Sequence, residues 1–441
     1  MRLFKHYRFS AFTLLALIFR LESTAQSTEL VQWVNPLIGT DSKYELSNGN
    51  TYPAIALPWG MHFWTPQTNK MGDGWCYQYA SNKIRGFKQT HQPSPWINDY
   101  GAFSIFATTE KLVFDEQKRE SWFSHKAETA KPYYYKAYLA DYHTTVEISP
   151  TERAAAFRIR YPETEKAYLI VDGFFKNSYV EVFPKERKII GYARNAAGGV
   201  PSNFKNYFVI TFDHEVEDVY SVHDGVLHAG VNKSECAHAG LILRFKTKAG
   251  QAVHVNIASS FISPEQAEIN LKREIGGRNF DQVTEQARLA WNQLLRRIKV
   301  EGGSDAQKTS FYTALYRTML FPRKFFEYDK DQRIVHYSPY DGRVHEGYLF
   351  TDNGFWDTFR AVFPFFTLMF PELNSQIMQG LVNTYKESGW LPEWASPGHR
   401  DCMVGSHSAS IIADSYLKGI RGYAIEVLYE AIKKNTEHEG P

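Results

Sequence analysis

Short stretches of alternating apolar and polar residues fill the first half of the chain. The alternation is clearest at 146–148, 157–161 and 253–257, where Val, Ile and Phe are separated by polar or charged residues. A period of two places successive side chains on opposite faces of a strand, one of them buried. Further apolar runs occupy 168–171, 207–212 and 241–245. Because turn residues separate these runs, we expect residues 27–262 to form a large antiparallel β-sandwich.

The period of the pattern changes at Ser263. Ser263 is a suitable N-cap, Pro264 suits the first helical position, and Gln266 stands where a capping box has its third residue. Two helices are expected, at roughly 264–276 and 281–298. They predict a helical linker over 263–299, which ends before the glycine pair at 302–303.

Residues 304–441 show the helical period. One face is shared by Phe311, Leu315 and Met319, a second by Leu373, Ile377 and Leu381, and a third by Ile425, Leu428 and Ile432. A further helix fits 408–418, with Gly419 as the residue that follows its end. The stretch 321–355 lacks this period, and long irregular segments in compact domains are usually functional. We expect five or six helices here.

The first 25 residues have the pattern of a signal peptide. Basic residues between positions 2 and 8 precede an apolar run of nine, AFTLLALIF, and small residues precede Gln26. Nine residues are too few for a membrane-spanning helix, which needs about 20, and no later stretch approaches that length. The mature protein is therefore expected to be exported to the periplasm or beyond the cell, and to be soluble.

Composition narrows the class of protein further. A chain of 441 residues predicts two or three domains. The net charge of +2 gives no strong positive potential of the kind that attracts nucleic acid. The hydrophobic content of 43% excludes a disordered chain. Cys76, Cys236 and Cys402 are far apart and form no C-x-x-C pair, so no thiolate zinc site is predicted. Aromatic residues, at 15%, suit either large cores or sugar-stacking surfaces.

Four segments combine glycine, tryptophan and acidic residues. They are VNPLIGT at 34–40 with TYP and LPWGM behind it, DGWCY at 73–77, DNGFWDTFR at 352–360, and GWLPEW at 389–394. Taken in this order, the set resembles glycoside hydrolase family 92, a family of exported bacterial exo-acting α-mannosidases. The resemblance runs from about Gln32 to the last residue.

The resemblance implies a multidomain β + α fold: an N-terminal β-sandwich, a helical linker and an (α/α)6 barrel. It also implies calcium-dependent hydrolysis of α-linked mannose with inversion. Inversion uses a carboxylic acid and a carboxylate base ~6.5–9.5 Å apart. By the same resemblance, the calcium is expected to coordinate the mannose hydroxyls.

The family's acidic motifs for the acid–base pair and for calcium are not found in this sequence. The resemblance therefore implies an N-terminal fragment of a longer enzyme, with an incomplete barrel over 304–441. The catalytic pair and the calcium ligands are expected beyond Pro441, so the fragment itself is expected to be inactive. The alternative is a naturally shortened, inactive form.

Candidate substrate-binding residues lie in the same motifs. Trp75 is either a platform for a sugar ring or a core residue at the sandwich edge. Asp357 is expected to bind mannose hydroxyls with Arg360 holding it and Trp356 beside it. The alternative is a plain i, i+3 pair of Asp357 and Arg360.

Four further positions in these motifs remain open. Asp352 or Asn353 could be the N-cap of the helix that carries Asp357. Trp390 and Glu393 are expected to contact sugar or to line the rim. No metal ligand is assigned to this chain.

The substrate class implied is an α-mannoside glycan, of N-glycan or mannan type, with no nucleic acid and no membrane span. A non-catalytic carbohydrate-binding protein is the main alternative, because it could keep Trp75 and Asp357 without an acid–base pair. A glycoside phosphorylase is a third possibility. It would need a phosphate site, and neither a glycine-rich loop nor a cluster of Lys and Arg near the helical motifs suggests one.

Overall fold

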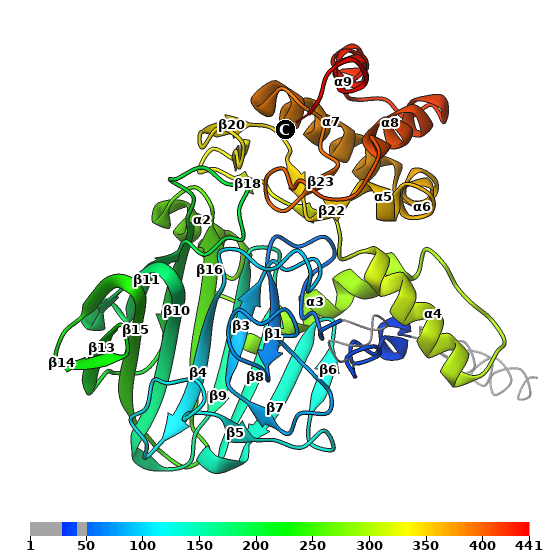
Figure 1. Ribbon diagram of the computed structural model, residues 1–441. Helices are drawn as coiled ribbons and strands as arrows, with labels where there is room; N and C mark the ends of the chain where they lie inside the picture. The colour runs from blue at the N-terminus through cyan, green and yellow to red at the C-terminus, as the bar shows by residue number, and fades with distance from the viewer. Residues whose placement is uncertain (1–28, 42–50, 441) are drawn as a thin grey trace, which may run out of the picture.

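A computed structural model of the chain describes residues 29–41 and 51–440 (Figure 1). The predicted signal peptide, 1–25, lies outside these residues. Among the described helices, none is both long and apolar enough to cross a membrane.

The first half of the molecule is a sandwich built from one long antiparallel sheet (Figure 1). β10 (Thr164–Phe183) connects the two layers, because its first half pairs with β4 (Phe103–Thr109) and its second half with β11 (Lys188–Ala193). Between the halves, Phe174, Lys176 and Asn177 have positive φ, which marks a sharp bend. β15 (Lys233–Thr247) follows β10 along both halves.

The sheet order is β1-β3-β4-β10-β11-β12-β16-β9-β8-β7-β6, with β15, β13 and β14 continuing from β10. The bounds of its other strands are β1 (Phe63–Gln67), β3 (Gly86–Thr90), β6 (Thr129–Lys131), β7 (Tyr134–Leu139), β8 (Thr144–Pro150), β9 (Ala154–Arg160), β12 (Asn206–Phe212), β13 (Asp218–His223), β14 (Val226–Ala229) and β16 (Ala252–Ser260). β2 (Lys83–Ile84) and β5 (Ser121–Trp122) pair with each other, and short 3-10 helices occupy Leu30–Trp33, Ala140–Tyr142 and Pro184–Glu186.

The register explains the alternation in the sequence. Val146 on β8 faces Ile159 on β9, and Ile159 faces Val253 on β16. All three are buried in the core between the layers. Arg158 points to the other side and binds Glu147 of the neighbouring strand at 2.7 Å. The predicted strands and the antiparallel sandwich are confirmed.

Two helices follow the sandwich where the pattern predicts them. α2 (Pro264–Glu274) begins after Ser263, whose side chain accepts the Gln266 N–H at 3.1 Å. The Gln266 side chain does not close a capping box, because its amide donates to the Tyr328 carbonyl at 2.8 Å. α3 (Phe280–Leu295) has a complete box formed by Asn279 and Gln282. α2 packs on β12 and β16, and α3 on β8 and β9.

Six α-helices follow α3 in the described chain: α4 (Asp305–Thr318), α5 (Phe355–Thr358), α6 (Val362–Met369), α7 (Pro371–Ser388), α8 (His407–Leu417) and α9 (Ile425–Glu437). Helices α5 to α9 gather above the sandwich in Figure 1. The stretch 321–355 forms short strands: β17 (Arg323–Lys324), β18 (Glu327–Tyr328), β19 (Ile334–Tyr337), β20 (Val344–Glu346), β21 (Phe350–Thr351) and β22 (Asn353–Gly354), and β22 pairs with β23 (Trp394–Ala395). The fold class of sandwich, helical linker and helical part is confirmed.

A second core joins the start of the chain to the helices. Side chains from the start of the chain pack with α3, α4, α6 and α7, namely Leu30, Val31, Val34, Ala54, Ala56, Trp59 and Phe63, whereas Ile55 lies in the core between the layers of the sandwich. At its centre Trp291 is fully buried and donates from Nε1 to the Ala56 carbonyl at 2.8 Å. The chain before β1 therefore contributes side chains to both cores and joins the sandwich to the helical part.

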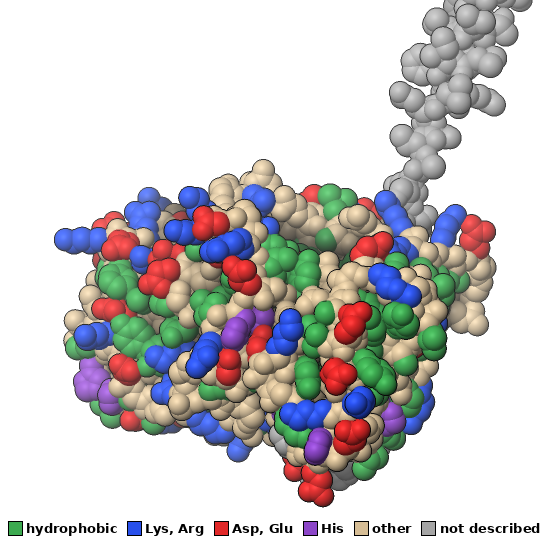
Figure 2. All heavy atoms as spheres, turned by 90° about the horizontal axis from the view of Figure 1, so that it is seen from above, with side chains coloured by type: hydrophobic (Ala, Val, Ile, Leu, Met, Phe, Trp, Pro, Cys, Tyr) green, Lys and Arg blue, Asp and Glu red, His purple; other side chains and the backbone are tan. Residues whose placement is uncertain are grey.

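Apolar side chains remain on the outer surface of the helical part. Leu368 on α6, Leu417 on α8 and Tyr429 on α9 are 78%, 83% and 61% exposed. A groove of about 500 Å³ runs between α8 and α9, lined by Ile412, Tyr416 and Ile425 among others. Figure 2, which looks down on this side, shows hydrophobic side chains gathered between charged ones. Exposed apolar patches of this kind are typical of contact surfaces.

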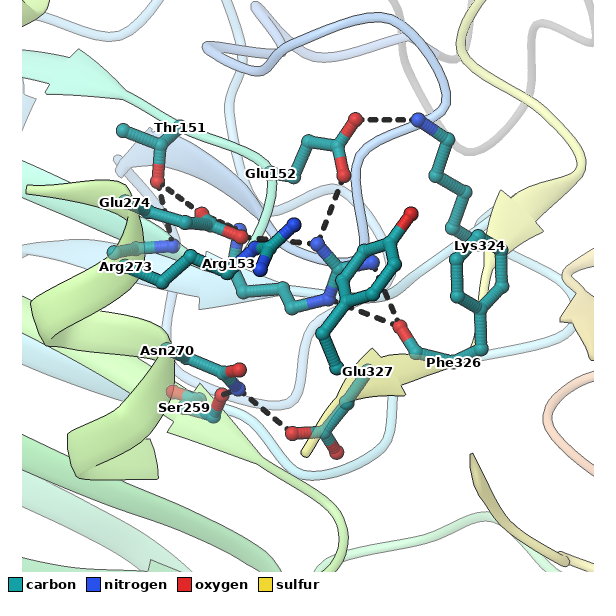
Figure 3. Close-up of polar contacts among 12 residues, drawn as sticks. Thr151, Glu152, Arg153, Ser259, Asn270, Arg273, Glu274, Lys324, Phe326 and Glu327 are labelled. Carbon is teal, nitrogen blue, oxygen red and sulfur yellow. Dashed lines mark hydrogen bonds and ion pairs between the residues drawn. The ribbon is translucent and has the colours of Figure 1, made fainter. Parts of the chain in front are cut away.

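A buried arginine fastens the sandwich to the segment that leads into the helical part (Figure 3). Arg153, in the turn between β8 and β9, is 1% exposed at its side chain. It donates twice to the Phe326 carbonyl, at 2.9 and 2.7 Å, and once each to Glu152 and Glu274, at 2.8 and 2.9 Å. The guanidinium thus joins three parts of the chain: a turn of the sandwich, α2 and the start of the helical part.

The carboxylates around Arg153 are held by further partners. Burial raises the pKa of Glu152, but the charges of Lys324 and Arg153 outweigh it and lower that pKa to about 2. On the other side Glu327 accepts from Ser260 Oγ at 2.9 Å and from Asn270 Nδ2 at 2.7 Å (Figure 3). Each buried charge at this junction therefore has a fixed partner.

Replacing Arg153 is expected to destabilise the whole chain. In Arg153→Met, Glu152 and Glu274 lose a buried partner and the Phe326 carbonyl loses two donors, which should cost about 3–5 kcal/mol. Arg160→Met is the matched control, because this nearby arginine is 44% exposed and also pairs with a glutamate, and it should cost less than about 1 kcal/mol. Urea denaturation followed by circular dichroism measures both. Equal midpoints for the two variants would contradict the assignment.

Candidate functional site

A cleft of about 520 Å³ lies where loops of the sandwich meet the helical part. One wall is the loop that follows β3, and the other is formed by the segments around β22, β23 and residues 402–403. The lining residues are Pro93, Ser94, Trp96, Ile97, Phe321, Asp352, Asn353, Gly354, Asp357, Thr358, Trp394, Cys402 and Met403. The cleft is thus shared between residues more than 200 positions apart in the sequence.

Gly354 sets the geometry of the helical wall. It pairs with Trp394 across β22 and β23, and a Cβ at this position would overlap the Trp394 indole and the Asp357 carboxylate. α5 begins at the next residue, Phe355, whose N–H donates to the Glu393 carbonyl at 3.1 Å. Only glycine allows the indole and the carboxylate to approach this closely, and Asp357 is exposed to the cleft.

Asp352 forms the floor of the cleft and is buried. Its Oδ2 lies 2.7 Å from Arg323 Nε and accepts from the Tyr100 hydroxyl at 2.8 Å, and its Oδ1 accepts from the Ser396 hydroxyl at 2.9 Å. Burial raises the pKa of this carboxyl to about 7, against the opposing effects of Arg323 and the two hydroxyls. The N-cap of α5 is Gly354, so the suggestion that Asp352 or Asn353 caps this helix is wrong.

A buried row of aromatic residues continues from Asp352 into the sandwich. Tyr100 stacks on His91, with ring centroids 4.8 Å apart, and His91 Nε2 lies 2.6 Å from His62 Nδ1. His91 Nδ1 is 2.6 Å from the Tyr100 carbonyl and must donate to it. His91 Nε2 is then an acceptor, which assigns the proton of His62 to Nδ1. Burial holds the pKa of both imidazoles well below the usual range, so the pair is neutral.

Arg323 completes the floor from the other side and is fully buried. Its guanidinium lies 3.5 Å from the centre of the Phe63 ring and donates to the Thr90 carbonyl and the Tyr52 hydroxyl, each at 3.3 Å. Since Phe63, Thr90 and Tyr52 precede or belong to the sandwich, Arg323 ties the floor of the cleft to the first half of the chain.

Two tryptophans build the sandwich wall. Trp96 lines the cleft and is 56% exposed. Trp75 meets it edge to face, with ring centroids 5.2 Å apart. The turn that presents Trp75 is closed by its own N–H, which donates to Asp73 Oδ1 at 2.9 Å. Trp75 therefore supports Trp96 from behind.

Arg400 joins the two walls at the rim. It follows the β23 segment and donates to the Ile97 carbonyl at 2.8 Å and to the Gly198 carbonyl at 3.2 Å. Ile97 is next to Trp96, so this contact fixes the loop that carries the exposed indole relative to the helical wall.

The structure brings only some of the predicted residues into the cleft. Asp357 lines it, whereas Arg360 lies over the rings of Trp356 and Phe359, at 4.9 and 4.6 Å from their centres. No ion pair between Asp357 and Arg360 is formed in the described chain, so the predicted support of one by the other is wrong. Trp356 is half-buried beneath Arg360.

The residues predicted from the last motif lie beside the cleft. Glu393 accepts from the Ser406 hydroxyl at 3.0 Å, and its backbone carbonyl anchors the start of α5. Trp390 lies under the ammonium group of Lys434 on α9, 4.3 Å from the ring centre. Neither is among the residues that line the cleft.

Several residues of the cleft were missed by the sequence analysis. Trp394 and Asn353 stand inside motifs that were noticed, so their composition was a usable signal. Arg323 and Tyr100 stand in no motif, and nothing near them in the sequence indicates that they meet at Asp352. Met403, 47% exposed at the rim, gave no signal either.

The chain matches two sequence families. Residues 33–260 match the glycosyl hydrolase family 92 N-terminal domain, and residues 266–441 match the glycosyl hydrolase family 92 catalytic domain. A curated relative, an uncharacterized secreted glycosidase of Arthroderma benhamiae, is 22% identical over 94% of this chain and 53% of its own length.

Solved structures of the same family are similar to this fold. A family 92 inverting mannosidase of Bacteroides thetaiotaomicron has 45% identity and a TM-score of 0.92, over 94% of this chain and 56% of that one. A family 92 α-mannosidase of the same organism, in complex with mannoimidazole, has 26% identity and a TM-score of 0.83, over 93% of this chain and 56% of that one. The chain spans about half the length of these relatives. Since the two family domains together match nearly all of it, the chain belongs to glycosyl hydrolase family 92.

Proposed function

We propose that this chain recognises the mannose of an α-mannoside and that the whole protein hydrolyses it as an exo-acting, inverting, calcium-dependent α-mannosidase. The observation that carries the proposal is the cleft, which is lined by the exposed carboxylate of Asp357 and by the indole rings of Trp96 and Trp394. A carboxylate accepts hydrogen bonds from neighbouring sugar hydroxyls, and an indole face packs on the apolar face of a hexose. The structural neighbours named as mannosidases support mannose as that sugar.

The main residues of the cleft, and those that lie beside it, have roles in this proposal. Asp357 accepts hydrogen bonds from mannose hydroxyls, and Trp394 packs beside it. Trp96, supported by Trp75, stacks on the sugar that leaves. The floor at Asp352 keeps the two walls in register. Trp356 and Arg360 brace the short helix from behind, while Trp390 and Glu393 act from the rim at most.

The inverting chemistry needs a pair of carboxyl groups, one acting as acid and the other as base. Among the described residues, Asp352 and Asp357 are the carboxylates that line the cleft. Asp352 is held by Arg323, Tyr100 and Ser396, so it is not free to activate water. We therefore place the acid and the base of the reaction beyond Pro441, and we expect these 441 residues to bind without turnover.

The described residues also do not fit a calcium site in the cleft. Calcium takes six to eight oxygen ligands, and Asp357 alone offers a free carboxylate there. The calcium ligands are therefore proposed to lie beyond Pro441 as well.

A carbohydrate-binding protein without catalysis is the second candidate. This candidate is favoured by the three partners that hold Asp352, because they leave the described part of the cleft without a free pair of carboxyl groups. The two candidates differ in turnover by the whole protein and not in binding by this chain.

Export and substrate range complete the proposal. The leader pattern at 1–25 and a relative described as secreted support an exported protein, in the periplasm or outside the cell. An open cleft with an exposed indole at its rim suits the non-reducing end of an N-glycan or a mannan.

Turnover separates the two candidates. Incubation with α-linked mannobiose should release mannose from the whole protein, and a calcium chelator should stop the release. Residues 27–441 should release none, because the proposal places the catalytic pair beyond Pro441. Mannose is measured by ion chromatography. Calcium-dependent turnover by residues 27–441 would show that the acid and base lie among the residues described here.

Asp357 is expected to dominate binding of the first sugar. In residues 27–441, Asp357→Asn should weaken mannose binding about 10- to 100-fold, because hydrogen bonds to a charged group contribute about 1.5–3 kcal/mol. Its melting temperature should not change, since the side chain is exposed. Asp401→Asn, a change at an exposed aspartate outside the cleft lining, is the control in the same calorimetric titration. Equal affinities for the two variants would remove Asp357 from the site.

The tryptophan wall is expected to act on the second sugar. Trp96→Ala and Trp75→Ala should weaken binding of mannobiose about 3- to 10-fold, in line with aromatic packing of about 0.5–1.5 kcal/mol, and leave binding of mannose unchanged. Trp122→Ala, on β5 and 49% exposed, is the control for loss of a surface indole. A loss for mannose that equals the loss for mannobiose would place the wall at the first sugar instead.

A further inference from the structure

A hairpin of the sandwich brings together three side chains of metal-binding type. They lie away from the cleft and outside the four sequence motifs. They are His223 at the end of β13, Asp224 in the following turn and Cys236 on β15. One ligand atom of each lies within 4.8 Å of the ligand atoms of the other two. Among the described residues, this is the one group of three potential metal ligands with so close a spacing.

The turn between β13 and β14 is built to hold Asp224 in place. Asp224 and Gly225 have φ of 49° and 85°, as in the two-residue hairpin turns that need positive φ, and His223 pairs with Val226 across them. Asp224 is also fixed to β15, because its N–H donates to the His238 carbonyl at 3.1 Å and its Oδ1 accepts the His238 N–H at 2.8 Å. This leaves Asp224 Oδ2 as the free oxygen.

The neighbouring strand places the thiol on the same side. Residues two apart on a strand face the same way, so Ser234, Cys236 and His238 share a face of β15. Ser234 Oγ lies 3.4 Å from His223 Nδ1 and 3.5 Å from Cys236 Sγ. Cys236 is a free, half-buried thiol, while His223 and Asp224 are exposed, and the imidazole of His223 can turn toward the thiol.

We propose that His223, Asp224 and Cys236 bind a zinc ion, with water as the fourth ligand. Zinc takes imidazole nitrogen, carboxylate oxygen and thiolate sulfur at about 2.0–2.3 Å in a tetrahedron, whose ligand atoms then lie about 3.5 Å apart. Rotation of the His223 side chain, together with a small shift of the hairpin turn that keeps Asp224 Oδ1 on the His238 N–H, closes the present spacing to that value. A thiolate and an imidazole select zinc over calcium and magnesium, which prefer oxygen ligands.

Binding at this site fastens the hairpin to β15. The Cys236 thiol gives its proton to solvent as the sulfur–metal bond forms, so affinity falls at low pH. β14 is exposed along its whole length, and among the described strands its partner is β13 alone. The metal adds a link between the β13–β14 turn and β15. It also stabilises the folded state by mass action.

The test uses metal titration of residues 27–441 after treatment with a chelator. Calorimetry with zinc should give one site, and cobalt should give the absorption band of a sulfur-to-cobalt bond. Cys236→Ser and His223→Gln should each weaken zinc binding by more than about 100-fold, since changes outside the ligand shell alone cost about 10- to 100-fold. Excess calcium should not displace the zinc.

Two control variants keep the test specific. Cys402→Ser removes another half-buried free thiol, and His228→Gln removes an exposed histidine of β14, and both should bind zinc like the unchanged protein. Without metal, all four variants should melt close to the unchanged protein, which checks that they fold. Zinc binding that survives Cys236→Ser, or cobalt binding without the sulfur band, would place the metal elsewhere and overturn the proposal.

Discussion

The burial of two arginines between the sandwich and the helical part is the constraint on which the rest of the structure depends. A guanidinium without water must be surrounded by acceptors or it is strongly destabilising. Arg153 finds them in Glu152, Glu274 and the Phe326 carbonyl, and Arg323 finds them in Asp352, Tyr52 and the Thr90 carbonyl. Because each set of partners comes from both halves of the molecule, the two halves have one permitted arrangement.

That arrangement is what makes the cleft. Its aromatic wall comes from loops of the sandwich, its carboxylate from the first turn of α5, and its floor from Asp352 between them. A sugar held there touches both halves at once. Precise placement matters because hydrogen bonds to sugar hydroxyls are directional, and a wall that moved by an ångström would lose them. In the buried row of Tyr100, His91 and His62, the His91 ring stiffens the sandwich side by the same logic, since both of its nitrogens are hydrogen-bonded, one to the Tyr100 carbonyl and the other to His62.

The two regions proposed to bind ligands use opposite physical means. In the cleft, oxygen and aromatic carbon face an open volume that suits a neutral, hydroxyl-rich ring. At the hairpin turn, nitrogen, oxygen and sulfur converge within a few ångströms, which suits a small cation. The cleft lies where the sandwich meets the helical part, whereas the hairpin site lies within β13, β14 and β15. Loss of one site need not affect the other.

By itself, the sequence determined what depends on neighbours along the chain. The alternation at 157–161 gave the buried face of β9, Ser263 and Pro264 marked the start of α2, and the motifs around Asp357 gave the family. It could not decide what depends on the packing of distant segments. Trp390 and Trp394 share one motif, yet one packs under α9 and the other lines the cleft. Tyr100 meets Asp352 across 252 positions, and Cys236 meets His223 only because β13 and β15 pair. Local propensity acts over a few residues, whereas these contacts arise when burial of apolar surface and the pairing of buried charges select one packing of the whole chain.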